Sequence, residues 1–279
     1  MAAKAKYVLF VHGIGEQEPG YSDKLWDVLW KDVPRPDIEK REFFYYDSFQ
    51  TAEAKLQVPT YATMLGQGVN QLVARLWPGV SLAPAVADFV TNTLAHVAYF
   101  LAVPQVQREI LDKFEGSLRD IIVDAEAHGV YFPRTQITVV SHSLGTVVSY
   151  LTMHRIAPDE TLGISNGVGI KNLYTIATPL ELIRRVSSWF PGFLHVDHIT
   201  GGISRPVQTV DNSRDTNIRE WFSYRHSWDP VASLAPLTGQ PPLDSPDTEP
   251  FVFGDVQLTH THDFDKYMEQ AREHIRNHL

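Results

Sequence analysis

The stretch that decides the fold runs from Ile137 to Val148 and reads ITVVSHSLGTVV. A run of β-branched residues stops at Ser-His-Ser-Leu-Gly, and a helical pattern starts at once. This order predicts a strand, a tight turn and a helix, with Ser143 at the apex of the turn. In such a nucleophile elbow the turn exposes the serine hydroxyl above the sheet, and the N-terminus of the helix directs its positive dipole end toward it.

Small residues are required two positions before and two positions after the serine, where strand and helix nearly touch. Ser141 and Gly145 occupy these positions, and Ser141 stands where glycine is more usual. The alternative interpretation is an ordinary turn that holds a serine and a glycine by chance. The flanking patterns favour the elbow, because they supply the structural context that a five-residue motif lacks by itself.

Size and composition are those of a globular α/β protein. The chain has 279 residues, of which 43% are hydrophobic and 20% charged, and this suits one large domain or one domain with an insertion. The net charge of −9 argues against nucleic acid as a partner and against electrostatic attachment to anionic membranes. The absence of cysteine excludes disulfides, thiolate metal sites and cysteine nucleophiles.

No stretch of the sequence is predicted to be a targeting or membrane-spanning segment. The first apolar run, Tyr7 to Val11, is shorter than the hydrophobic region of a signal peptide. The segment from Leu82 to Val103 is apolar enough to consider as a span, but Pro84 and Asp88 make insertion costly. We therefore expect a cytoplasmic protein with no integral membrane span.

The remaining sequence alternates between strand and helix patterns. This alternation predicts an α/β fold with a doubly wound, mostly parallel sheet, and we expect residues 1–279 to form a single domain. Residues 181–206 are expected to form a surface loop. The predicted strands are 7–11, 41–46, 137–141, 172–177, 217–225 and 251–258, and the predicted helices are 21–31, 105–127 (ended by Gly129), 144–156 and 264–278 (with Asp263 as N-cap).

Residues 52–104 depart from the strand–helix alternation. Pro59, Pro78 and Pro84 separate apolar segments with helical character. We interpret this region as a helical insertion or cap within the domain. A cap over the active site would favour acyl chains and could contact lipid surfaces. The alternative is that these are core helices without a role in substrate binding.

A serine nucleophile requires a general base, and a carboxylate must hold that base in the right tautomer. In this type of sheet the three residues follow the chain order serine, acid, histidine. Asp229 is the candidate acid, because it lies in Trp-Asp-Pro-Val after the predicted strand 217–225. Asp211 and Asp255 are the alternatives.

The candidate base lies in Thr-His-Thr-His-Asp, residues 259–263, between the last predicted strand and the last predicted helix. We choose His262, next to the expected N-cap, and His260 is the alternative. Two histidines could also suggest a metal site, but no further ligands stand at a suitable spacing, so we expect no metal. His12 and His142 each precede a tight turn and are interpreted as structural histidines.

The oxyanion formed by attack must meet preorganised donors. One is the backbone N–H of Leu144, directly after the serine. The other is expected in the Gly-rich loop after the first strand, with the Ile14 N–H as first choice and Gly15 as second. Such a loop could instead bind phosphate, but it does not continue into either Gly-rich phosphate-binding motif.

These residues resemble the α/β-hydrolase superfamily, especially its lipase- and esterase-like serine hydrolases. The motifs that carry the resemblance are VHGIG (11–15), SHSLG (141–145), ATPL (177–180) and WDPV (228–231), so that it spans nearly the whole chain. The resemblance implies an α/β-hydrolase fold and a Ser–His–Asp hydrolase that needs no metal or cofactor. Its triad maps onto Ser143, Asp229 and His262.

The resulting hypothesis is hydrolysis of carboxylic esters through an acyl-serine intermediate. The expected partner is a small-molecule ester or lipid-like substrate, with peripheral lipid contact through the insertion. Two alternatives use the same residues differently. The first is a binding module without catalysis, and the second is an acyltransferase or thioesterase with the same triad. The sequence sets neither the acyl specificity nor the oligomeric state.

Overall fold

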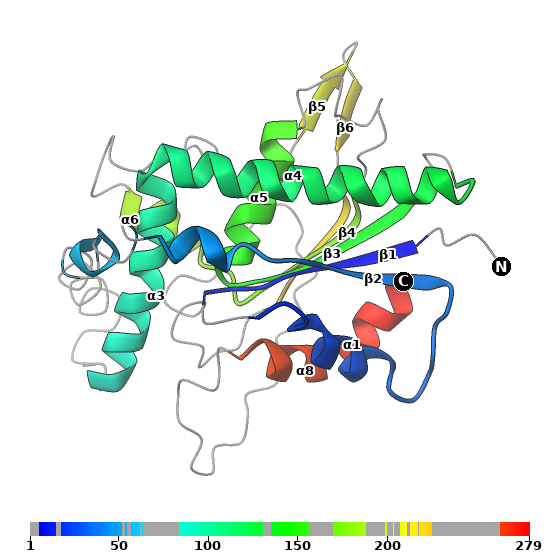
Figure 1. Cartoon of the computed structure of the whole chain (residues 1–279), viewed down its shortest axis with the longest axis horizontal. Helices are drawn as coiled ribbons and strands as arrows, with labels where there is room; N and C mark the ends of the chain where they lie inside the picture. Colours follow the sequence, from blue (N-terminus) through cyan, green and yellow to red (C-terminus); the bar gives the residue numbers. More distant parts are fainter. Residues whose placement is uncertain are drawn as a thin grey trace.

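The chain folds around a parallel β-sheet with helices on both faces (Figure 1). The computed structural model describes residues 6–14, 18–51, 54, 57–61, 63, 84–130, 135–156, 170–187, 199, 203, 207–210, 213–216, 218–224 and 263–279. Within these residues, five strands form the sheet, namely β1 (Lys6–Val11), β2 (Ile38–Phe43), β3 (Gln136–His142), β4 (Ile170–Ile176) and β7 (Ile218–Tyr224). Every neighbouring pair in it is parallel.

The strand order is β2-β1-β3-β4-β7. The chain leaves β1 toward one edge of the sheet, and it leaves β3 toward the other. The order therefore reverses between β1 and β3, and ligands of open α/β sheets bind outside the carboxyl ends of the strands at this kind of switch point. The topology alone directs attention to the loops that follow β1 and β3.

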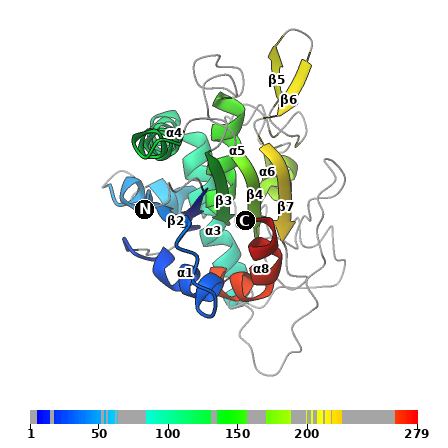
Figure 2. The same cartoon turned by 90° about the vertical axis from the view of Figure 1, so that its right-hand side faces the viewer.

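Helices cover both faces, as predicted for a doubly wound sheet (Figure 2). One face packs against α1 (Ser22–Trp30) and α8 (Phe264–His278). The other packs against α4 (Pro104–Ala127) and α5 (Leu144–Ile156), with α3 (Pro84–Ala102) and α6 (Leu180–Ser187) extending the same core.

The continuous apolar strand β1 supplies both cores. Alternate residues of a strand point to opposite faces. Tyr7, Leu9 and Val11 are buried on the side of α4 and α5, whereas Val8 and Phe10 are buried on the side of α1 and α8. The five-residue apolar run in the sequence is therefore explained by burial on both faces.

The carboxyl ends of the strands lie at the end of the sheet away from the N-terminus of the chain, and α3 stands there (Figure 1). The 3-10 helix η1 (Tyr46–Phe49) packs against it, with the rings of Phe49 and Tyr99 6.1 Å apart. Among the helices that the structure describes, none has the length and apolar character needed to cross a bilayer. The helix α3 falls within the predicted insertion 52–104, whose role as a cap stays a prediction.

The end of α4 bears out the predicted role of Gly129. This residue has a φ of 78°, and its N–H donates to the carbonyl of Glu126 at 2.9 Å. The N–H of Val130 donates to the carbonyl of Ala125, also at 2.9 Å. These two bonds form a Schellman motif, in which a glycine adopts the left-handed conformation at little cost.

The second strand begins and ends three residues before the predicted 41–46. A search for apolar runs placed this strand wrongly because most of its residues are charged or polar. The charged residues are stable in it because they make ion pairs at the edge of the described sheet. Arg41 contacts Glu39 and Asp124 at 2.5 and 2.8 Å. Partnered charges of this kind are tolerated on an edge strand.

Three further elements lie where the sequence predicted a loop or made no prediction. The helix α6 occupies the start of 181–206, and its Glu181 contacts Arg184 and Arg185 at 2.6 and 3.1 Å. The strands β5 (Val207–Val210) and β6 (Ser213–Thr216) form a separate antiparallel pair. The predicted last strand, 251–258, lies outside the described residues.

Candidate functional site

Ser143 forms the turn between β3 and α5, as the sequence predicts. Its φ is 50°, a left-handed conformation that costs a non-glycine residue roughly 1–2 kcal/mol. Its N–H donates to the carbonyl of Ile176, the last residue of β4, at 2.9 Å. The turn is therefore tied to the neighbouring strand, and the helix begins at the very next residue.

Gly145 lets the first turn of α5 lie directly on the end of β1. A methyl group added here would be 2.4 Å from the carbonyl oxygen of His12 and 2.7 Å from that of Val11. Both atoms belong to the backbone and cannot move aside easily. At the other predicted small position, the Ser141 hydroxyl donates to the Tyr174 carbonyl at 2.9 Å, which accounts for serine instead of glycine.

The loop after β1 lies against Ser143. A methyl group added to Gly13 would be 2.7 Å from the Ser143 Cβ atom and 2.8 Å from His142 Nδ1. The parallel register produces this contact, because Val11 lies opposite Ser141 and each loop then advances by two residues. Glycine at position 13 is thus needed for close approach to the serine.

Ser143 is buried and keeps 1% of its surface in solvent. The sequence predicted that the elbow exposes its hydroxyl, and this prediction is wrong. The backbone of Gly13 packs against the Ser143 Cβ atom, and the Ser143 N–H is bonded to the carbonyl of Ile176. A polar reaction at this residue would therefore take place away from bulk water, where dipoles act more strongly.

The start of α5 presents backbone donors beside Ser143. The first N–H groups of a helix have no acceptor within it, and Leu144 is the first residue of α5. The carbonyl of Ser143 accepts both the N–H and the hydroxyl of Thr146, at 3.0 and 2.6 Å. The Thr146 hydroxyl also lies 2.7 Å from that of Thr178, which must act as donor because the Thr146 proton is already used.

These contacts fix the peptide group between Ser143 and Leu144. Its carbonyl is held by Thr146, so its N–H points the opposite way, as in any trans peptide. Ile14, the other predicted oxyanion donor, is partly buried against the core cluster that contains Leu144. One predicted donor thus lies in the loop after β1 and the other at the first residue of α5, on the two sides of the switch point.

His12 is a buried histidine held in one tautomer. Its Nδ1 donates to the carbonyl of Gly13 at 2.5 Å, so Nε2 is the acceptor for the N–H of Tyr45 at 3.4 Å. Burial lowers the pKa of His12 to about 4. The ring is neutral at physiological pH, and its contacts match the structural role predicted for it.

His142 joins the elbow to the start of α8. Its ring stacks on Phe264, with centroids 4.9 Å and planes 11° apart. Asp263 stands at the predicted N-cap position of this helix, although its side chain makes no capping hydrogen bond. The first turn of α8 is thereby placed next to the turn that carries Ser143.

The structure describes three of the five predicted site residues, namely Ser143, Leu144 and Ile14, and it brings their loops together. Within the described ranges, no three acidic or histidine side chains gather in a way that could hold a metal ion. The predicted acid and base, and the alternatives to the predicted residues, lie outside the described residues: Asp229, Asp211, Asp255, His262, His260 and Gly15.

Sequence reasoning missed three residues that shape this site. Thr146 and Thr178 brace the elbow, and Tyr45 contacts the β1 loop. The signal for Thr146 was its place three residues after the serine, where a hydroxyl can bond back to the carbonyl at the helix start. Tyr45 left no local signal, because its contact depends on how β2 pairs with β1.

Comparison with known proteins adds little to this geometry. No protein-family model matches the chain, and no curated protein matches it. Among solved structures it is similar to an uncharacterized protein from Pseudomonas aeruginosa, with 11% sequence identity and a TM-score of 0.33. The match covers 85% of this chain and 38% of that one, so the chain spans about two fifths of the solved protein's length. A similarity of this size supports no conclusion about fold family or function.

Proposed function

We propose that the protein is a serine hydrolase with an α/β-hydrolase fold that cleaves carboxylic esters through an acyl-serine intermediate. The observation that carries this proposal is the setting of Ser143. It adopts a left-handed turn at the switch point of the sheet, with α5 starting directly after it and Gly13 packed against it. This is the setting that a nucleophile elbow requires.

Chain connectivity supports His262 as the base. Phe264 stacks on His142, the residue before Ser143, and His262 precedes Phe264 by two positions. Two residues span at most about 7 Å between Cα atoms. His260 is two positions more distant along the chain, which is why His262 is preferred.

The order of the strands supports Asp229 as the acid. The strand β7 ends at Tyr224, five residues before Asp229. It runs parallel to β4, so its carboxyl end lies at the same edge of the sheet as the turn of Ser143. In α/β-hydrolase chain order the acid follows a strand beyond the nucleophile and precedes the histidine.

In the proposed reaction His262 accepts the proton of Ser143 as its Oγ atom attacks the ester carbonyl. The oxyanion of the tetrahedral intermediate accepts hydrogen bonds from the N–H groups of Leu144 and Ile14. The intermediate collapses, and the leaving alcohol takes the proton from His262. Water then attacks the acyl-serine with His262 as base, the bond to Ser143 Oγ breaks to release the carboxylic acid, and His262 returns the proton to Ser143. Asp229 holds the imidazole throughout.

Lipid-like or medium-chain acyl groups are the proposed substrates. The support is the position of α3 and η1 at the carboxyl end of the sheet, where a substrate would approach Ser143 (Figure 1). Their packing brings aromatic and aliphatic side chains to this edge. A cap of residues 52–104 would offer an apolar surface to the acyl chain.

The test is covalent labelling by a fluorophosphonate together with hydrolysis of a p-nitrophenyl ester series. Ser143→Ala is expected to lose labelling and to lower turnover on the order of 10⁶-fold, because removing the nucleophile of a triad has an effect of this size. The matched control is Ser149→Ala on α5, because the buried hydroxyl of Ser149 has no hydrogen-bond partner among the described residues. It is expected to keep full activity.

Each outcome is informative. Wild-type protein that neither reacts with the probe nor hydrolyses any ester would identify a binding module without catalysis. Hydrolysis retained in Ser143→Ala would reject the assignment of the nucleophile. Product analysis with added alcohol separates hydrolysis from acyl transfer: a hydrolase gives mainly the free acid, whereas an acyltransferase gives mainly the new ester and little free acid.

A further inference from the structure

Three loops at the carboxyl edge of the sheet are aligned by strand pairing. Val11 lies opposite Phe43 of β2 on one side and opposite Ser141 of β3 on the other. Two residues beyond this line come Tyr45, Gly13 and Ser143, one in each loop. The loop after β1, which carries the proposed donor Ile14, is thus placed between the serine and Tyr45.

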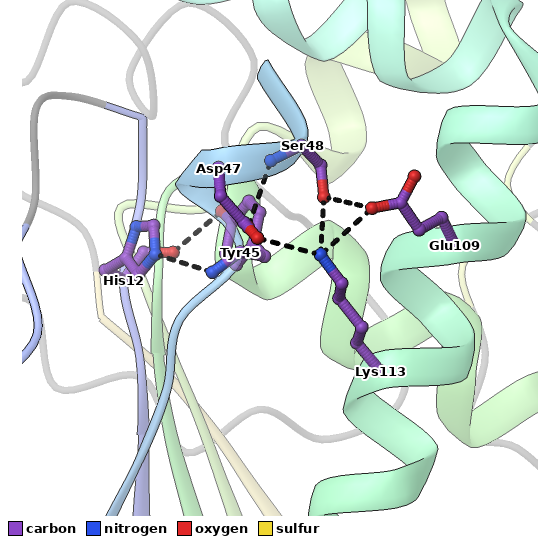
Figure 3. A network of polar contacts seen from close by, with 6 residues as sticks. All are labelled: His12, Tyr45, Asp47, Ser48, Glu109 and Lys113. Carbon is purple, nitrogen blue, oxygen red and sulfur yellow. Dashed lines mark hydrogen bonds and ion pairs between the residues drawn. The ribbon is translucent and has the colours of Figure 1, made fainter. Parts of the chain in front are cut away.

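Tyr45 makes several contacts with this loop, most of them to one residue (Figure 3). Its hydroxyl donates to the carbonyl of His12 at 2.9 Å, with a longer approach of 3.5 Å to the carbonyl of Gly13. Its N–H donates to His12 Nε2, and its ring stacks on the imidazole with centroids 4.3 Å and planes 8° apart. Tyr45 is fully buried, so these bonds are shielded from bulk solvent.

Through His12, these contacts also restrict the proposed oxyanion donor, the N–H of Ile14. Its Nδ1 donates to the carbonyl of Gly13 at 2.5 Å. That carbonyl belongs to the same peptide group as the N–H of Ile14, and in a trans peptide the two point in opposite directions. Holding the carbonyl therefore sets the direction of the N–H.

The two proposed donors differ in how they are held. The Leu144 N–H is oriented from within its own helix, through Thr146. After the β1 loop, the next helix that the structure describes is α1, which begins at Ser22. The direct restraint on the Gly13–Ile14 peptide group comes from His12 within the loop, and Tyr45 holds His12 from outside it.

Tyr45 is itself fastened to α4. It directly precedes η1, and its carbonyl accepts the N–H of Ser48 at 3.1 Å. The Ser48 hydroxyl donates to Glu109 at 2.9 Å, and Lys113 contacts Asp47 at 3.1 Å and Glu109 at 2.9 Å (Figure 3). Hydrogen bonds from Lys113 and Ser48 lower the pKa of Glu109, so this carboxylate is charged at neutral pH.

We propose that Tyr45 is a positioning residue for ester hydrolysis, which holds the loop after β1 so that the Ile14 N–H faces the oxyanion. This inference rests on the proposed function. Tyr45 touches neither substrate nor reacting atoms, and it acts through the His12 carbonyl and imidazole. Tyr45 is therefore expected to stabilise the transition state, in which the oxyanion forms, without changing how tightly the ester binds.

The test is Tyr45→Phe, which keeps the ring and the backbone N–H and removes only the hydroxyl. Turnover is expected to fall about 10- to 100-fold with KM within about twofold, since loss of an oxyanion donor lowers kcat by about 10²–10³ and a misdirected donor loses part of that. Inhibition by a trifluoromethyl ketone, which forms a tetrahedral adduct with serine, is expected to weaken by the same factor. A purely structural role would not produce this parallel loss.

The matched control is Tyr174→Phe on β4, a buried tyrosine whose hydroxyl has no partner among the described residues. It is expected to leave kcat and the inhibition constant unchanged. An unchanged kcat in Tyr45→Phe, a rise in KM alone, or an equal loss in Tyr174→Phe would each overturn the inference while leaving the proposed function intact. Wild-type protein without esterase activity would overturn both.

Lys113→Met provides a second route if Tyr45→Phe does not fold. This change removes the contacts of Lys113 with Asp47 and Ser48 of η1, whereas the Ser48 hydroxyl keeps its hydrogen bond to Glu109. A smaller loss of about threefold in kcat at constant KM is expected, because Tyr45 keeps its own bonds but loses part of its support. An unchanged kcat in this variant would then count against the positioning role.

Discussion

Two neighbouring turns at the carboxyl edge of the sheet have nearly the same backbone. Ser143 follows β3 with a φ of 50°, and Ala177 follows β4 with a φ of 53°. The N–H of Ser143 donates to the last carbonyl of β4, and the N–H of Ala177 donates to that of β7, both at 2.9 Å. A left-handed residue at this edge is therefore a repeated feature of the sheet and does not by itself mark a catalytic position.

What distinguishes the first turn is its surroundings. The helix α5 begins directly after Ser143, whereas α6 begins three residues after Ala177 and is preceded by Pro179, which has no N–H. Only the first turn faces the glycine of the β1 loop. Backbone donors and a side-chain hydroxyl thus meet at Ser143 and are not repeated at Ala177.

The largest expected effect comes from moving the hydroxyl between the two turns. The double variant Ser143→Ala, Ala177→Ser keeps a hydroxyl at this edge of the sheet in a turn of the same shape. We expect no fluorophosphonate labelling and a loss of turnover on the order of 10⁶-fold, as in Ser143→Ala alone, because the second turn has neither the donors nor the base. Labelling of position 177, located by peptide mass spectrometry, would show that turn shape is sufficient.

An intermediate effect is expected from Gly145→Ala, which tests the close contact between α5 and β1. The added methyl group would overlap the backbone oxygens of His12 and Val11, so the free energy of unfolding should fall by about 3 kcal/mol. Gly116→Ala on α4 is the matched control, since a methyl group there meets nothing within 4 Å. It should raise stability by about 0.5–1 kcal/mol. Chemical denaturation of both variants decides, and equal values would contradict the contact.

The smallest effect is expected at Ala177→Gly. Relief of the left-handed conformation, about 1–2 kcal/mol, offsets the loss of a buried methyl group and the greater freedom of the unfolded chain. The free energy of unfolding should change by less than about 0.5 kcal/mol. Ala125→Gly, in a helical and buried position, should cost about 2 kcal/mol. Equal losses in thermal unfolding would show that the turn at Ala177 carries no strain.

Local sequence predicted the elements whose signals are local. The apolar run of β1, the amphipathic helix α4 with its glycine end, and the strand, turn and helix around Ser143 all lie where the sequence placed them. The helix α6 was missed because it has eight residues, too few for periodicity to separate it from the following loop. The strand β2 was predicted three residues too late because it contains charged residues that make ion pairs and no run of apolar residues.

The residues of the candidate site also fall into those that the sequence could predict and those that depend on strand pairing. Ser143 and Leu144 could be chosen from adjacent residues, and Gly13 and Ile14 from the rule that parallel strands end at one edge. The contact between Tyr45 and His12 could not, because it depends on the pairing of Val11 with Phe43 and on the point at which β2 ends. An error of three residues in that strand was enough to hide it.

The pairing of β1 with its two neighbours also limits how the length of this chain can vary. One residue inserted within β1 would shift everything after it by about 3.3 Å and turn alternate side chains to the opposite face. Gly13 would then no longer lie beside Ser143, nor His12 beside Tyr45. Length changes in the β5–β6 pair, which forms a sheet of its own, leave that alignment intact. Homologous chains should therefore differ in length at the hairpin while β1, β2 and β3 keep constant spacing to their loops.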